Sequence, residues 1–215
     1  RIEFAETIHF PIQNWVGSKQ VHGANIVKVT KNVSGAGSLD FESAIPDTDG
    51  LYTADEDLLL TSLYADCVPL YFYAPNEKLV GLAHAGWKGT VAKIGPKMVE
   101  TWCEKENADV QTIKAAIGPS IGDCCYEVDD RVISEVKAAL AGADDVSVYK
   151  ENEDGKYQLN LQKLNEKLLL LAGLLPENIT VSDQCTSCEN DLFFSHRKDR
   201  GKTGRMMSFI GTKGV

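Results

Sequence analysis

The stretch "LLLTSLYADCVPLYFYAP" (residues 58–75) decides the fold class of this sequence. It is too apolar for a strand with one face in water, and Asp66, Cys67 and Pro69 interrupt it, which predicts two buried strand-like halves with polar groups at the break. The next stretch, "KLVGLAHAG" (78–86), predicts another buried strand. Neighbouring strands here and strand–helix alternation elsewhere predict a mixed α/β fold, with mixed sheets and helices packed outside.

The flanking segments supply the expected helices. "TVAKIGPKMVETWCEK" (90–105) carries apolar residues at helical spacing, and its Gly95-Pro96 pair predicts a kink or a split. "VDDRVISEVKAAL" (128–140) predicts a second helix, since its two aspartates suit a helix start. The remaining expectations are extended segments around a turn at 20–30, a strand and loop at 112–122, a strand at 157–161, a leucine-rich helix to about Ala172 and a strand at 178–183.

Length and charge limit the class of partner. The 215 residues fit a single catalytic domain, 1–215, and contain no apolar stretch long enough to cross a membrane. With 22 Lys and Arg against 31 Asp and Glu, the net charge of -9 gives no field that would hold nucleic acid. No signal-peptide pattern opens the chain, so we expect a cytoplasmic protein whose partner is a small molecule, neither nucleic acid nor membrane.

Six cysteines in a chain of this length do not indicate a disulfide scaffold. Cys124 and Cys125 are adjacent, while Cys185 and Cys188 form a CxxC pair. A zinc ribbon would need a second CxxC pair, and adjacent cysteines are a poor chelate for a tetrahedral ion. These four, like Cys103, are therefore interpreted as buried structural thiols in a reducing compartment.

His22, Cys67 and His84 form the candidate metal site, because each lies where an expected strand ends. Two imidazoles and one thiolate suit catalytic zinc, since three protein ligands leave a fourth position open, and the thiolate would also tolerate copper. The alternative is a core thiol with two hydrogen-bonded histidines. Asp66, beside Cys67, is a candidate general base or a group that orients a ligand histidine, and it could equally be a turn residue.

Two segments are candidates for binding an anion. "HAGWKGT" (84–90) offers glycines, a helix start and the Lys88 ammonium, although the same glycines could simply make a strand-to-helix turn. "HRKDRGKTGR" (196–205) concentrates basic residues, including Arg197 and Arg205, in an otherwise acidic chain. It could bind phosphate through its arginines or be a solvated loop paired with surface carboxylates.

Several stretches together resemble the multicopper polyphenol oxidase or laccase-domain family, which is also described as a family of purine nucleoside phosphorylases with adenosine deaminase activity. The matching stretches are "KQVHGANI", "DGLYT", "YADCVPLYFYAP", "GLAHAGWKGT", "AAIGPSIGDCCYEV" and "DQCTSCENDLFFSHRKDRGKTGRMMSFI", in order along nearly the whole chain. The resemblance implies a layered α/β/β/α arrangement, related to toxin cysteine deamidases, with His22, Cys67 and His84 as zinc ligands. The glycine-rich upstream segment typical of relatives, roughly "RHGGVS", is absent from the sequence, so we expect an N-terminal segment to be missing.

The resemblance also implies a reaction, the phosphorolysis of purine nucleosides such as adenosine, inosine, guanosine or methylthioadenosine. Asp66 and Cys67 are then the candidate catalytic residues, and Lys88, Arg197 and Arg205 the candidate phosphate-binding residues, with zinc as cofactor.

Two other functions stay open at this point. Copper-dependent phenol oxidation needs more ligands than four histidines supply. A non-enzymatic zinc-binding module would need a fourth protein ligand at the site, for example Cys124 or Cys185.

Overall fold

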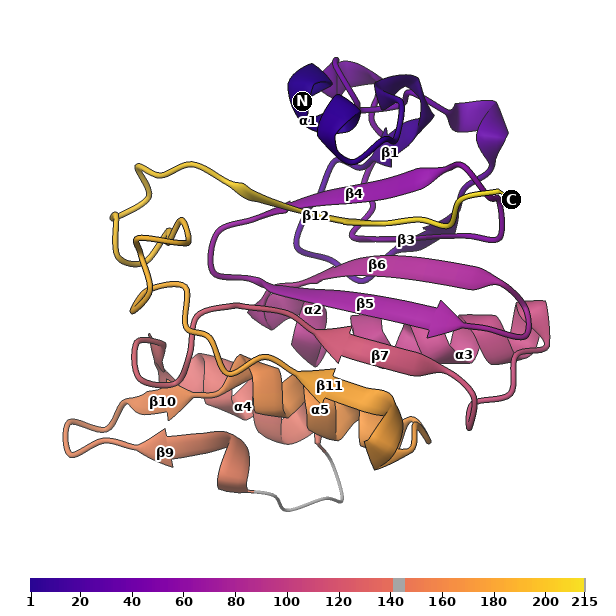
Figure 1. The fold of residues 1–215 in the computed structure, drawn as a ribbon. Coiled ribbons are helices and arrows are strands. Elements are labelled where there is room, and N and C mark those ends of the chain that lie inside the picture. The colour runs from indigo at the N-terminus through magenta and orange to yellow at the C-terminus, as the bar shows by residue number, and fades with distance from the viewer. Residues whose placement is uncertain (141–145, 215) are drawn as a thin grey trace.

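In a computed structural model, residues 1–140 and 146–214 are described, and they form three sheets flanked by helices (Figure 1). The large sheet is mixed and has the strand order β11-β7-β5-β6-β3-β2. Its strands are β11 (Ile179–Val181), β7 (Lys114–Ile117), β5 (Val68–Ala74), β6 (Leu79–Ala85), β3 (Gly50–Thr53) and β2 (Ile26–Lys28).

Two smaller sheets complete the strand inventory of the described residues. The first consists of β1 (Trp15–Gly17), β4 (Leu59–Tyr64) and β12 (Met206–Ile210), and the second of β8 (Glu127–Val128), β10 (Tyr157–Leu159) and β9 (Tyr149–Glu151). The helices are α1 (Ile2–Thr7), α2 (Trp87–Val91), α3 (Ile94–Glu106), α4 (Asp130–Ala139) and α5 (Leu161–Leu171). Short 3-10 turns lie at Ile12–Asn14, Lys31–Val33, Phe41–Ser43, Val146–Val148 and Pro176–Asn178.

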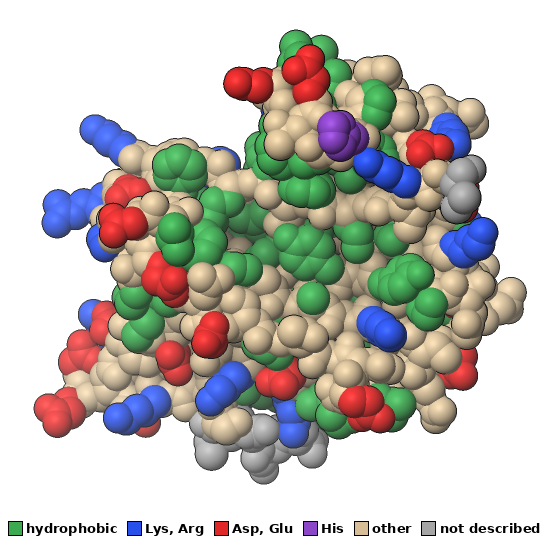
Figure 2. Space-filling view, in the orientation of Figure 1, with side chains coloured by type: hydrophobic (Ala, Val, Ile, Leu, Met, Phe, Trp, Pro, Cys, Tyr) green, Lys and Arg blue, Asp and Glu red, His purple; other side chains and the backbone are tan. Residues whose placement is uncertain are grey.

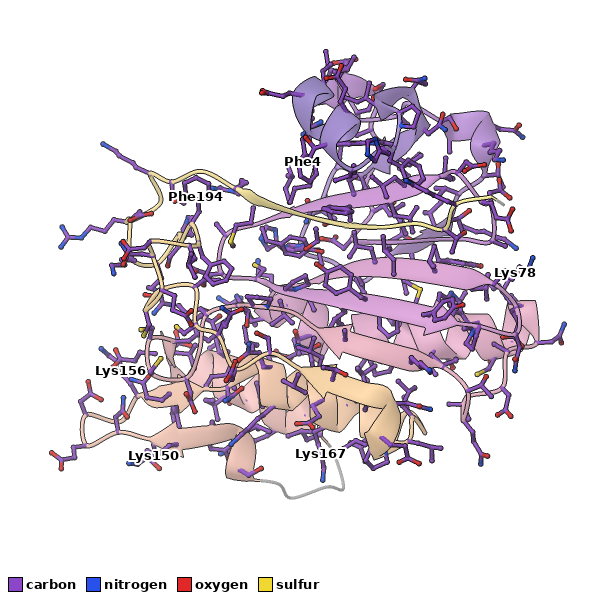
Figure 3. The ribbon with its side chains drawn as sticks, in the orientation of Figure 1. Phe4, Lys78, Lys150, Lys156, Lys167 and Phe194 are labelled. Atoms are coloured by element: carbon purple, nitrogen blue, oxygen red, sulfur yellow. The ribbon has the colours of Figure 1, made fainter. Side chains whose placement is uncertain are left out.

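Three hydrophobic cores separate four layers, which confirms the expected α/β/β/α arrangement. Between the large sheet and the helices, Phe72 of β5 packs with Trp102 of α3. Between the two sheets, the core contains Leu60 of β4 and Leu82 of β6. The third core lies beneath α1, where Phe4, labelled in Figure 3, makes edge contacts with aromatic rings of β1 and β12.

The break in residues 58–75 is the point at which the chain passes from one sheet to the other. Residues before it form β4 of the small sheet, and residues after it form β5 in the middle of the large sheet. Asp66 makes the turn with a left-handed φ of 82°. The prediction of two buried strands with polar groups between them is therefore confirmed, but Pro69, which was expected at the break, lies within β5 opposite His84.

The helices agree with the sequence expectations except at one break. The predicted helix at 90–105 is split into α2 and α3 at Lys93, which has a φ of 62°, rather than at the Gly95-Pro96 pair. Pro96 lies in the first turn of α3, where its missing N–H removes no helical hydrogen bond. The start of α4 is as predicted, since the Asp129 side chain accepts a hydrogen bond from the Val132 N–H.

Several elements were not expected from the sequence: α1, β1, β8, β9 and β12. None of the described helices is both long enough and apolar enough to cross a membrane.

Candidate metal centre

The sheet register brings Cys67 and His84 to the same edge of the large sheet. β5 and β6 are antiparallel, with Val68 opposite Ala85 and Pro69 opposite His84. Cys67 immediately precedes β5, so it lies beside the end of β6 that carries His84. His22 reaches the same place from the loop between β1 and β2, where it has a left-handed φ of 61°.

The three side chains form one compact group. The potential ligand atoms of His22, Cys67 and His84 all lie within 4.8 Å of one another. The two imidazole rings meet edge to face with their centres 4.7 Å apart. His84 is buried and His22 is exposed, so the group connects the interior of the sheet to the surface.

The Cys67 thiol suits a soft divalent cation, and His84 must release a proton when it binds one. Burial raises the pKa of the Cys67 thiol, but its hydrogen bonds with His22 and His84 outweigh that effect and lower the pKa to about 7. Burial lowers the pKa of His84, while Asp49 and the Cys67 thiolate raise it to about 9. Near neutral pH, Cys67 thus carries the thiolate character that metal ligation requires.

Asp49, which the sequence analysis did not single out, organises both histidines. Its carboxylate lies 2.8 Å from His84 Nδ1 and accepts hydrogen bonds from the backbone N–H groups of Val21, His22 and Gly23. With Nδ1 engaged by the carboxylate, Nε2 is the nitrogen of His84 that remains for a metal. The same carboxylate fixes the strained loop that presents His22. The only signal in the sequence was an aspartate directly before the segment "GLYT", and by itself such a residue resembles an ordinary turn residue.

The glycines of "HAGWKGT" allow close packing around the candidate metal ligands. A Cβ atom on Gly86 would lie 3.0 Å from Cys67 Sγ and 3.3 Å from His22 Cδ2. A Cβ atom on Gly89 would lie 2.8 Å from the carbonyl oxygen of Gly23. The absence of a side chain at both positions therefore lets the His22 loop pack against the end of β6.

We expect Gly86→Ala to weaken metal binding by about tenfold, since the added methyl group must displace the thiol or the imidazole from its position and such misplacement costs about one order of magnitude. The measurement is zinc affinity by competition with a chromogenic chelator. Gly155→Ala is the control for an added methyl group away from the site: a Cβ there meets no atom within 4 Å, but its φ of 75° strains an alanine, so thermal unfolding is measured for both variants. Unchanged affinity in Gly86→Ala would show that the ligands adjust freely.

A cavity of about 590 Å³ opens next to the three side chains. The candidate ligands His22, Cys67 and His84 lie in its wall together with Arg197 and Arg205. The other side chains in its wall that bear on binding are Gln20, Phe41, Asp66, Trp87, Tyr126 and His196. Figure 2 shows one face of the molecule, with hydrophobic side chains gathered along the notch between the N-terminal layer and the loop that follows β11.

Arg197 and Arg205 are positioned differently in this wall. The Arg197 guanidinium donates a hydrogen bond to the carbonyl oxygen of Glu127 and lies 5.0 Å from the centre of the Tyr126 ring. Arg205 donates only to carbonyl oxygens of its own loop, those of Thr203 and Gly204. Both guanidinium groups retain further N–H donors for an anion in the cavity.

Asp66 is buried, and its carboxylate binds two residues of the loop that follows β11. One carboxylate oxygen accepts a hydrogen bond of 2.7 Å from the Thr186 hydroxyl, and the other accepts one of 2.7 Å from the backbone N–H of Arg197. The suggestion that Asp66 orients a ligand histidine requires correction, since Asp49 makes that contact with His84. Asp66 does lie in the cavity wall, so its suggested role as a general base stays a prediction.

The structure does not bring Lys88 to this cavity. Lys88 is exposed on α2, and its ammonium lies 5.8 Å from the centre of the Trp87 ring. Two wall residues that sequence reasoning missed, Tyr126 and His196, directly follow Cys125 and directly precede Arg197. Their adjacency to singled-out residues was the only signal in the sequence.

Cys124 and Cys185 do not join the group of His22, Cys67 and His84. They form a second group with Cys125 and Cys188, and the interpretation of these four cysteines as buried is wrong. Cys124 and Cys188 are exposed, Cys125 is partly exposed, and only Cys185 of this group is buried.

A layered mixed α/β domain with two histidines and a thiol in the wall of a cationic cavity defines a candidate metal-dependent enzyme. Comparison with known families agrees, since the family described as multi-copper polyphenol oxidoreductase laccase matches residues 1–213. The chain therefore belongs to this family.

Two relatives and one solved structure are similar to this chain over nearly its whole length. The purine nucleoside phosphorylase YlmD of Geobacillus stearothermophilus is 49% identical over 213 residues, covering 99% of this chain and 77% of the relative. The protein of the same name from Bacillus subtilis is 47% identical over 209 residues, covering 97% and 74%. The crystal structure of YlmD from Geobacillus stearothermophilus superposes with a TM-score of 0.97, covering 99% of this chain and 78% of that one. By name, these relatives are enzymes.

Proposed function

We propose that this protein is a zinc-dependent purine nucleoside phosphorylase that also deaminates adenosine. It would convert adenosine, inosine, guanosine or methylthioadenosine and phosphate into the free base and a pentose-1-phosphate. The observation that carries the proposal is a thiol between two imidazoles in the wall of a cavity that two arginines also line. The names of relatives 47% and 49% identical support the reaction class.

His22, Cys67 and His84 fit zinc by number and by chemistry. Their ligand atoms lie within 4.8 Å of one another, and Asp49 holds His84 in the tautomer that a metal needs. Bound there, zinc would supply a Lewis acid at the wall of the cavity. Among the described residues, no fourth His, Cys, Asp or Glu joins this group, which argues against a closed structural site.

Phosphorolysis requires phosphate and the sugar carbon C1′ to be held in line while the base departs. A phosphate oxygen forms the new bond to C1′ as the C1′–N9 bond breaks. The electron pair of the broken bond stays on the purine. Arg197 and Arg205 are the proposed phosphate-binding residues, since paired guanidinium donors match a phosphate. The aromatic rings of Phe41, Trp87 and Tyr126 offer the purine apolar faces in the same cavity.

Deamination of adenosine would use the same cavity with water in place of phosphate. Attack of water at C6 breaks the bond to the exocyclic nitrogen, which leaves as ammonia, and requires a group that accepts the proton of that water and passes it to the leaving nitrogen. Asp66 is the proposed acceptor, because its carboxylate lies in the cavity wall and has lone pairs beyond those that Thr186 and Arg197 occupy.

Copper-dependent phenol oxidation is the function that the family description suggests in place of this one. A multicopper site needs a mononuclear centre and a trinuclear centre. The sequence contains four histidines, and His22 and His84 are the two that join a potential metal-ligand group of the described residues. Full nucleoside activity in a preparation containing zinc and no copper would remove this alternative.

The proposal is tested with metal-defined protein and adenosine, with and without phosphate, followed by identification of the products. Free adenine that forms only with phosphate supports phosphorolysis, and inosine formed under both conditions supports deamination. If the zinc-loaded protein formed neither adenine nor inosine, both proposed activities would be overturned.

Arg205→Ala is expected to raise the KM for phosphate by about 10- to 100-fold with a smaller change in the KM for the nucleoside, since a charge-assisted hydrogen bond contributes about 1.5–3 kcal/mol. The measurement is initial rate against phosphate concentration at saturating nucleoside. Lys202→Ala is the matched control, because Lys202 is an exposed cation of the same basic stretch that is not part of the cavity wall. An unchanged phosphate dependence in Arg205→Ala would remove Arg205 from the phosphate site.

A further inference from the structure

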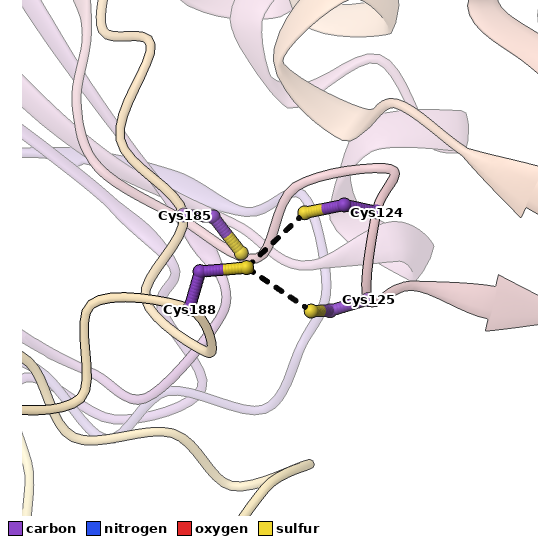
Figure 4. A group of neighbouring side chains, drawn as sticks. All are labelled: Cys124, Cys125, Cys185 and Cys188. Atoms are coloured by element: carbon purple, nitrogen blue, oxygen red, sulfur yellow. Dashed lines mark hydrogen bonds between the residues drawn. The ribbon is translucent and has the colours of Figure 1, made fainter.

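The cluster of four cysteines away from the proposed active site has the composition of a metal site. Cys124 and Cys125 lie in the loop between β7 and β8, and Cys185 and Cys188 lie in the loop after β11. All four sulfur atoms lie within 4.8 Å of one another, and Figure 4 shows the side chains converging from the two loops. We propose that these four cysteines bind a second zinc ion in a closed tetrathiolate site that stabilises the wall of the cavity.

The spacing of the sulfur atoms fits one tetrahedral ion. With Zn–S bonds of about 2.3 Å, the corners of a tetrahedron lie about 3.8 Å apart. The Sγ atom of Cys188 lies 3.5 Å from that of Cys124 and 3.5 Å from that of Cys125, and no pair of the four exceeds 4.8 Å. Cysteines that hold an iron–sulfur cluster bind different irons and are spread more widely than ligands of a single ion.

A turn removes the objection to adjacent cysteines as ligands. Neighbouring side chains of an extended segment point in opposite directions. Here the Cys125 N–H bonds to the carbonyl oxygen of Gly122, which closes a turn and lets Cys124 and Cys125 both face Cys188. The CxxC pair is folded in the same way, since the Cys188 N–H bonds to the carbonyl oxygen of Cys185.

The two loops are already fastened to each other around the sulfur atoms. Ser120 and Cys185 form an isolated β-bridge, and the Thr186 N–H bonds to the carbonyl oxygen of Ser120. The Gly122 N–H donates to the sulfur of Cys185 at 3.2 Å, a contact that stabilises thiolate charge. Such a preformed arrangement lowers the cost of ordering the ligands when a metal binds.

The position of the cluster explains what a second zinc would do. Residues 182–205, between β11 and β12, contain no helix or strand of their own, and structureless segments of this length are uncommon in compact domains and usually functional where they are ordered. Thr186, between the two cysteines of the CxxC pair, donates its hydroxyl to Asp66, which also accepts the Arg197 N–H. Cys125 directly precedes Tyr126, whose ring lies against Arg197.

Metal content per chain gives the first test. We expect about two zinc ions per purified chain, falling to about one in Cys188→Ser and about one in Cys67→Ser, because the two ligand groups share no residue. Cys103→Ser, a cysteine of α3 outside both groups, is the control and should keep both ions. One ion in the wild type that only Cys67→Ser removes would overturn the second site, and this result is independent of whether the protein cleaves nucleosides.

A second measurement needs no variant and separates zinc from a disulfide. Cys124 and Cys188 are exposed, so free thiols there should react rapidly with an alkylating reagent. With zinc bound, we expect slow alkylation that becomes rapid after a strong chelator is added, followed at each cysteine by mass spectrometry. Rapid alkylation before the chelator, or a disulfide that only a reductant opens, would contradict the proposal.

Discussion

Cys67→Ser is expected to lower kcat/KM for nucleoside phosphorolysis by more than about 100-fold, since altering even the outer partners of a metal site costs about 10- to 100-fold and Cys67 is a proposed direct ligand. A serine oxygen is a much poorer ligand for a soft cation than a thiolate. The same variant should lose zinc at this site. Initial rates and metal content, measured on one preparation, check both expectations.

Two comparisons make the Cys67 result interpretable. Cys103→Ser removes a thiol from α3 and should retain activity and metal content. Thermal unfolding separates the loss of a ligand from the loss of the fold. A Cys67→Ser protein that is folded, free of zinc at this site and fully active would remove the metal from the proposed reaction.

Asp49→Asn is expected to lower both the free energy of unfolding and the affinity for zinc. The amide group would meet backbone N–H groups that now donate to a carboxylate, and one or more of them would lose its partner in a partly buried position. We expect a loss of about 3–5 kcal/mol in the free energy of unfolding, as when a buried ion pair loses one partner. Zinc affinity should fall by about 10- to 100-fold, because His84 loses the carboxylate that orients it.

Asp55→Asn is the matched control for Asp49→Asn. The Asp55 carboxylate also accepts a backbone hydrogen bond, from the Lys31 N–H, but in an exposed position. Its replacement should cost less than about 1 kcal/mol and leave zinc affinity unchanged. Urea unfolding and chelator competition measure the two quantities. If both aspartate variants behaved alike, Asp49 would have no special role at the candidate metal centre.

The elements that the sequence predicted well are those whose burial shows in their own composition. β5 and β6 are central strands covered on both faces, so they consist almost entirely of apolar residues. β12 was missed because most of its residues are only partly buried, so they give no clear strand pattern, and because its partner, β4, lies far away in the sequence. The break before α3 depends on the left-handed backbone of Lys93, for which a lysine gives no signal.

The candidate site shows the same limit. Residue types indicated His22, Cys67 and His84 as a group, but the partner of His84 depends on the register of β3 beside β6, which places Asp49 at the end of both strands. The four cysteines of the second cluster looked unsuitable as ligands because sequence adjacency does not reveal a turn. Long-range register and local turn geometry, rather than residue identity, decided both points.

The pairing of β12 with β4 affects the order in which the molecule can be completed. β4 is the middle strand of its sheet, with β1 on one side and β12, from the last residues described, on the other. Until residues 206–210 have emerged during synthesis, one edge of β4 stays open and can pair with another chain. Arg205 and Met207 of the cavity wall are placed by the same late step. A portion of the chain that ends before residue 205 therefore lacks part of the cavity wall.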